Sequence, residues 1–104
     1  MKSVYILLDR SGSMSTTIDE ALSSINNYVR DLEEATRTTL VAFDDQEFKY
    51  VRLDVPAWNW RAITKDEVYP RGMTPLYDSA ARLLNKMMDD KPERAVFVIL
   101  TDGH

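Results

Sequence analysis

The sequence contains no cysteine, three glycines, four prolines and a single histidine, His104, in 104 residues. Without cysteine, the protein forms no disulfide and no thiolate metal site. No apolar run approaches the length of a transmembrane helix, so we expect no membrane partner. Met1–Ser3 leads directly into a predicted strand and leaves no room for a signal peptide. We therefore expect a cytoplasmic protein, encoded by a bacterium or a phage.

Acidic residues outnumber basic ones, and the formal net charge is −4. This balance argues against a nucleic-acid partner bound through its phosphates. The hydrophobic fraction of 44% and the charged fraction of 29% are ordinary for a globular protein. At this length, residues 1–104 are expected to form a single domain with a modest core.

The most informative segment is Asp9-Arg10-Ser11-Gly12-Ser13, which directly follows the apolar run Val4–Leu8. It places one carboxylate and two hydroxyl groups on a tight turn at the end of a predicted buried strand. These are hard oxygen donors, the type that binds Mg²⁺ or Mn²⁺. Taken alone, the segment is equally consistent with a hydrogen-bonded turn.

Two further residues extend this pattern. Thr74 precedes Pro75 at the start of a predicted helix, and Asp102 follows the apolar strand Ala95–Thr101. Alone, Thr74 reads as a helix N-cap and Asp102 as part of a strand-to-turn junction. Because all five oxygen-bearing residues follow in order at the ends of elements, we predict a metal site of Asp9, Ser11, Ser13, Thr74 and Asp102.

Hydrophobic spacing predicts alternating strands and helices. A helix begins near Thr17, which forms a capping box with Glu20, and ends near Ala35. A second helix begins at Thr74-Pro75 and ends at Asp89–Pro92. Its predicted inner face comprises Leu76, Ala80, Leu83, Leu84 and Met87. The predicted strands are Val4–Leu8, Thr38–Phe43, Phe48–Val55 and Ala95–Thr101, with a polar turn at 44–47.

This order of elements predicts a three-layer α/β fold with helices on both faces of a mostly parallel, four-stranded sheet. The hairpin places Phe48–Val55 antiparallel at one edge. With right-handed crossovers, the first and last strands are neighbours. Asp9 and Asp102 are then expected at adjacent carboxyl ends, at the switch point where open α/β sheets bind ligands.

The motifs resemble the von Willebrand factor A domain and its metal-ion-dependent adhesion site. The resemblance implies a Rossmann-like fold and a protein-interaction function. It also implies that Ser11, Ser13 and Thr74 bind Mg²⁺ or Mn²⁺ directly, whereas Asp9 and Asp102 act directly or through water. A remaining coordination position is filled in the family by a carboxylate from a partner protein.

The family domain continues beyond the position of Asp102 with further helices and two more strands. The resemblance therefore implies a shortened domain in which the strand Ala95–Thr101 has an unpaired outer edge. That strand is apolar on both faces and carries no charge to discourage pairing. We expect a homodimer, formed by pairing of the 95–101 edge or by exchange of elements between chains.

Two other functions remain open at this point. In one, the protein is a structural or oligomerisation module with a vestigial metal site. In the other, Asp9 is similar to the nucleophile of Mg²⁺-dependent haloacid-dehalogenase-type phosphatases. Those enzymes use a second aspartate two positions later, where this chain has Ser11, and Arg10 is expected to point outward. We therefore expect no enzymatic activity.

Trp58 and Trp60 lie in the irregular segment between the hairpin and the second predicted helix. Their spacing allows two roles. They either cover the core from the loop or, if exposed, serve as anchors at a protein interface.

Overall fold

The computed structural model describes residues 2–44, 47–68, 70 and 76–101. The strands are β1 (Lys2–Asp9), β2 (Arg37–Phe43), β3 (Phe48–Pro56) and β4 (Arg94–Leu100). The helices are α1 (Ile18–Arg30) and α2 (Leu76–Asp90), with short 3₁₀ turns η1 (Gly12–Thr16) and η2 (Ala57–Asn59). Among these residues, the order of elements agrees with the prediction from the sequence.

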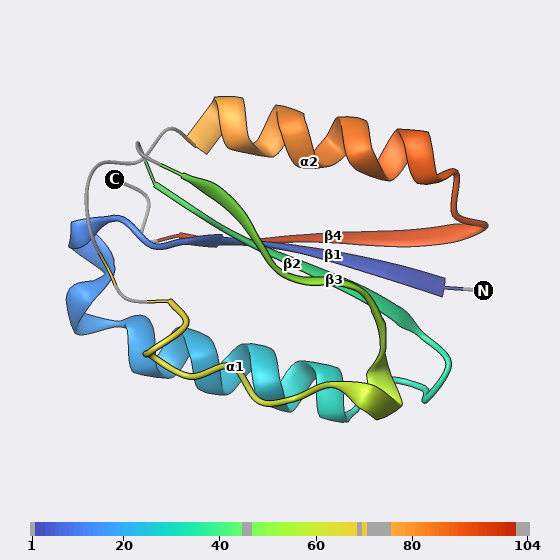
Figure 1. Cartoon of the computed structure of the whole chain (residues 1–104), viewed down its shortest axis with the longest axis horizontal. Coiled ribbons are helices and arrows are strands. Elements are labelled where there is room, and N and C mark those ends of the chain that lie inside the picture. Colours follow the sequence, from blue (N-terminus) through green and yellow to red (C-terminus); the bar gives the residue numbers. More distant parts are fainter. Residues whose placement is uncertain (1, 45–46, 69, 71–75, 102–104) are drawn as a thin grey trace.

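The described strands form one sheet in the order β3-β2-β1-β4. β1 pairs in parallel with β2 and with β4, whereas β3 pairs antiparallel to β2. Figure 1 shows α1 and α2 on opposite faces of this sheet. The predicted α/β architecture, including the antiparallel edge strand and the neighbouring first and last strands, is confirmed.

β1 is buried on both faces because it lies between two parallel neighbours beneath both helices. Val4, Ile6 and Leu8 contribute to the core beneath α1. Tyr5 and Leu7 point to the other face and belong to the core beneath α2. Alternate residues of one strand thus supply two separate cores, which explains why the run is continuously apolar.

α1 ends five residues before the predicted limit, at Arg30 rather than near Ala35. The reason lies in the backbone carbonyls of the segment that follows. The carbonyl of Glu34 accepts a hydrogen bond from the backbone N–H of Trp58, and that of Thr36 accepts one from Ala57. The segment between α1 and β2 is therefore held against η2 and does not continue the helix.

The predicted capping box at the start of α1 is also wrong. Thr17 occupies the N-cap position but makes no side-chain capping hydrogen bond. Its hydroxyl instead donates to the carbonyl of Met14 at 3.4 Å. Because η1 leads directly into α1, the chain reaches the cap from a preceding turn, not from the extended conformation that a capping box requires.

α2 packs on the sheet through one narrow stripe. Leu83 is fully buried, and Leu76, Ala80 and Met87 pack around the same core. Leu84, predicted on the inner face, is 39% exposed, so that prediction is wrong. The helix ends at Asp90, and Lys91 follows with a φ of 49°, in the left-handed region typical of residues that terminate helices.

The two tryptophans have different environments. Trp60 is half-buried against the core beneath α1, and its indole N–H donates to the Oδ1 atom of Asn26 at 3.1 Å. Trp58, on η2, is 69% exposed. Trp60 therefore covers the core, and Trp58 meets the condition of exposure on which the second role depends.

Candidate functional site

The carboxyl ends of three parallel strands meet at one edge of the sheet. Asp9, the last residue of β1, is opposite Phe43 of β2, and Leu8 is opposite Leu100 of β4. β1 is the central strand of the three, so its last side chain lies between its neighbours. Asp9 is fully buried there. This placement agrees with the switch-point position expected from the sequence.

Both carboxylate oxygens of Asp9 accept hydrogen bonds. Oδ1 accepts from the backbone N–H of Ser11 at 2.7 Å, which folds the chain back over the carboxylate. Oδ2 accepts from the hydroxyl of Thr101 at 2.8 Å. The carboxylate therefore joins the turn after β1 to the residue that follows β4. These donors fix the orientation of the carboxylate.

The two serines lie together on this turn. Their hydroxyl oxygens are 3.0 Å apart, close enough to share a hydrogen bond. Ser11 is buried, whereas Ser13, at the start of η1, is exposed. The carbonyl of Ser11 accepts the backbone N–H of Met14 at 2.9 Å and closes the turn. A buried carboxylate and two hydroxyls are thereby brought together, with Ser13 open to solvent.

The remaining predicted ligands, Thr74 and Asp102, lie outside the described residues. In the described ranges 2–44, 47–68, 70 and 76–101, no three His, Cys, Asp or Glu side chains gather as a metal-binding group. A cation at this turn would rely on serine hydroxyls beside the Asp9 carboxylate. Hydroxyl and carboxylate oxygens are suitable ligands for Mg²⁺ and Mn²⁺.

Thr101 was not identified as a site residue from the sequence. Its hydroxyl contacts Asp9 directly from the end of β4, although 92 positions separate the two residues. The signal was a hydroxyl residue at the end of a strand predicted to lie beside β1.

Arg10 is buried, contrary to the expectation that it points outward. It is 1% exposed, and its Nη1 atom donates to the carboxylate of Glu47 at 3.0 Å. Its Nε atom lies 3.9 Å from the carboxylate of Asp44, and its backbone N–H donates to the carbonyl of Phe43. The guanidinium therefore ties the turn after β1 to the β2–β3 turn. The signal in the sequence was the pair of acidic residues after the neighbouring strand.

Comparison with known protein families assigns the chain to one of them. Residues 4–104 match the von Willebrand factor type A domain. The chain belongs to this family. Within the described residues, neither helix has the length and apolarity needed to cross a bilayer. Von Willebrand A domains generally act as protein-interaction modules.

Solved structures share the fold at low sequence identity. The ArnB paralog VWA2 from Sulfolobus acidocaldarius superposes with a TM-score of 0.77 at 19% identity, over 97% of this chain and 27% of that one. The N-terminal domains of the type V pili tip protein Mfa5 from Porphyromonas gingivalis give a TM-score of 0.75 at 18% identity. This second match covers 98% of this chain and 20% of that one. The chain thus spans well under half of either protein, and no curated protein sequence matches it significantly.

Proposed function

We propose that this von Willebrand A domain binds Mg²⁺ or Mn²⁺ through Asp9, Ser11, Ser13, Thr74 and Asp102. The bound cation would then engage a carboxylate of a protein partner in the cytoplasm. The observation that carries the proposal is the convergence of the Asp9 carboxylate and the Ser11 and Ser13 hydroxyls at the end of the central strand. The exposed position of Ser13 supports access for a partner at this turn.

A binding function is favoured over catalysis by the groups around Asp9. A phosphatase of the aspartate-nucleophile type needs a general acid near the nucleophile and a cation for the phosphoryl group. Ser11 stands where that acid would be, and its pKa is far too high for the task. Arg10, the nearest candidate cation in the sequence, contacts Asp44 and Glu47 instead. We therefore propose that the domain is not an enzyme.

Calorimetric titration with Mn²⁺ tests the metal site. We expect saturable binding by the wild-type chain and at least about tenfold weaker binding by Ser13→Ala, since a ligand hydroxyl is lost. Ser13 is exposed, so this change removes little packing. Asp9→Ala should abolish binding, but it also removes the acceptor for Ser11 and Thr101.

Ser23→Ala is the matched control for the metal titration, because Ser23 is an exposed serine on α1. It should bind Mn²⁺ like the wild type. If the folded wild type does not bind Mn²⁺, or if Ser13→Ala binds it equally well, the proposed site is wrong. Circular dichroism of each variant establishes that the protein under titration is folded.

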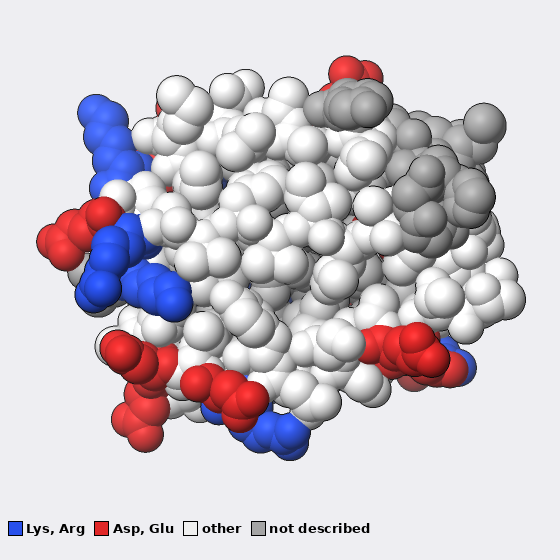
Figure 2. Space-filling model, turned by 180° about the vertical axis from the view of Figure 1, so that it is seen from behind, with Lys and Arg blue, Asp and Glu red and all other residues white. Residues whose placement is uncertain are grey.

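We also propose that the chain forms a homodimer through β4, and this surface favours the alternative function of an oligomerisation module. β4 is an outer strand of the described sheet, and Ile99 on it is 42% exposed. Figure 2 shows a broad uncharged surface on the side opposite the view of Figure 1, with Lys, Arg, Asp and Glu gathered at its margins. Two β4 edges related by a twofold axis would extend the sheet across both chains.

Sedimentation at micromolar concentration tests this dimer. The wild type should sediment as a dimer, and Ile99→Lys should weaken the association at least about tenfold, because a charge on an edge strand opposes pairing. Leu53→Lys provides the control, since Leu53 is 52% exposed on β3, the outer strand at the opposite end of the sheet. It should remain dimeric. A monodisperse wild-type monomer would contradict the proposal.

A further inference from the structure

A second feature suited to binding lies at the other end of the sheet from Asp9. Pro56, which ends β3, is paired with Arg37 at the start of β2, whereas Asp9 is opposite the end of β2. The 3₁₀ turn η2 follows Pro56 and presents Trp58 with 69% of its surface exposed. An exposed tryptophan next to the core of a small domain is a large apolar surface in contact with water.

The backbone around Trp58 is fixed. The N–H of Ala57 donates to the carbonyl of Thr36 at 2.8 Å, and the N–H of Trp58 donates to that of Glu34 at 3.2 Å. These bonds hold η2 against the segment between α1 and β2. Because this backbone is already ordered, Trp58 loses less conformational entropy when a partner covers it, so its burial contributes more to affinity.

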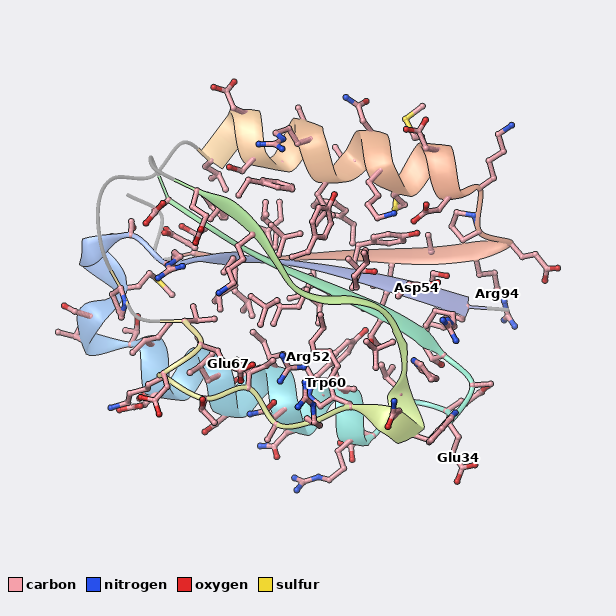
Figure 3. The ribbon with its side chains drawn as sticks, in the orientation of Figure 1. Glu34, Arg52, Asp54, Trp60, Glu67 and Arg94 are labelled. Carbon is pink, nitrogen blue, oxygen red and sulfur yellow. The ribbon has the colours of Figure 1, made fainter. Side chains whose placement is uncertain are left out.

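Trp58 and Trp60 face a common groove of about 390 Å³ beside the C-terminal half of α1. It is lined by Asn26, Arg30, Ala57, Trp58, Trp60 and Ala62. Figure 3 shows Trp60 with Arg52 and Glu67 beside α1. The guanidinium of Arg52 lies 5.7 Å from the centre of the Trp60 ring and pairs with Glu67 at 2.7 Å. The hydrogen bond from Arg52 holds the pKa of Glu67 below its usual value, so the pair stays charged at neutral pH.

The uncharged polar side chain in this groove, Asn26, is already hydrogen-bonded within the domain. The Oδ1 atom of Asn26 accepts the indole N–H of Trp60 and the backbone N–H of Ile63, which uses both of its lone pairs. Its amide group donates to the carbonyl of Ile63 at 3.1 Å. A sugar needs several free donors and acceptors around an aromatic platform. This groove offers aromatic and aliphatic surface with few of them, so a carbohydrate does not fit it.

One positive charge remains at the groove. The guanidinium of Arg30 donates to the neutral amide oxygen of Asn27 and makes no ion pair with any carboxylate in the described part of the chain. A nucleic acid is disfavoured, because Glu34 lies beside Trp58 and the net charge is −4. A single carboxylate next to an apolar side chain complements Arg30 and the tryptophans.

We propose that this groove binds a segment of a partner protein in which an apolar or aromatic side chain adjoins an aspartate or glutamate. The apolar side chain packs against Trp58 and Trp60, and the carboxylate pairs with Arg30. Tryptophan and arginine are the side chains that most often dominate binding energy at interfaces. This surface is separate from the metal site, so the domain has a second point of attachment.

Selection from a phage library of random linear peptides tests the groove. The wild-type chain is the target, and EDTA is present to exclude metal-mediated binding. We expect enriched peptides to share an apolar or aromatic residue beside Asp or Glu. For the tightest synthetic peptide, Kd should rise at least about tenfold for Trp58→Ala and about threefold or more for Arg30→Gln.

Two variants outside the groove provide matched controls. Leu53→Ala removes an exposed apolar side chain on β3, and Arg94→Gln removes an exposed cation on β4. Both should bind the peptide like the wild type. The proposal is overturned if no peptide is enriched, if the enriched peptides lack an acidic residue, or if Trp58→Ala binds them equally well. Because EDTA is present throughout, none of these results depends on the metal site.

Discussion

Replacing Leu83 with alanine is expected to lower the free energy of unfolding by about 3–4 kcal/mol. Leu83 is fully buried and lies in the core formed with Tyr5, Leu7, Val41 and Phe43. The loss comprises the transfer of the removed methyl groups and the cost of the cavity that remains. Urea unfolding followed by circular dichroism measures it.

The adjacent residue provides the control for this variant. Leu84→Ala changes the same residue type on the same helix, but Leu84 is 39% exposed. We expect it to cost about 1 kcal/mol or less. Equal losses for the two variants would contradict the orientation of α2 in this structure and would favour the broader inner face predicted from the sequence.

The second large effect is expected for Asn26→Ala, which should destabilise the protein by about 2–3 kcal/mol. The side chain of Asn26 holds the segment after η2 against α1 through three hydrogen bonds, to Trp60 and to both backbone groups of Ile63. Alanine would leave the N–H and the carbonyl of Ile63 without these partners next to a side chain that is 4% exposed. Unfolding in urea gives the loss, and tryptophan fluorescence reports the release of Trp60.

Asn27→Ala is the control for this second prediction. Asn27 is exposed, and its side chain accepts a hydrogen bond only from Arg30 among the described residues. The expected cost is about 0.5 kcal/mol or less. A loss for Asn26→Ala as small as this would mean that the segment containing Trp60 is held by Arg52 and Glu67, without a substantial contribution from α1.

The fold was predictable because the hydrophobic pattern of each segment and the order of the segments along the chain indicate the same arrangement. The continuous apolar run Val4–Leu8 indicated a strand buried on both faces, and the chain order placed it beside the last strand. From that arrangement alone, Asp9 could be placed at the switch point of the sheet. The spacing of Ser11 and Ser13 also indicated that their hydroxyls share one tight turn after the strand, although it did not indicate that they contact each other.

Features that depend on contacts between distant segments were not predictable. α1 ends at Arg30 because Thr36 and Glu34 bind η2, which lies about twenty residues further along the chain. Leu84 is at a position compatible with helical spacing, but the sheet is covered by a narrower stripe of α2. Arg10 was expected to point outward from its turn, and its burial is favoured by carboxylates that the β2–β3 turn supplies to its guanidinium.

The pairing of β1 with β4 also constrains how the chain folds during synthesis. Asp9 and its partner Thr101 are 92 positions apart, and the whole of β1 pairs with β4 at a similar separation. At ~5–20 residues per second, β1 leaves the ribosome about 5–18 seconds before β4 does. During this interval β1 can pair with β2, but its other edge remains exposed, and contacts of such long range form slowly. Docking of α1 covers one face of β1 but leaves this edge without a partner strand until β4 is made.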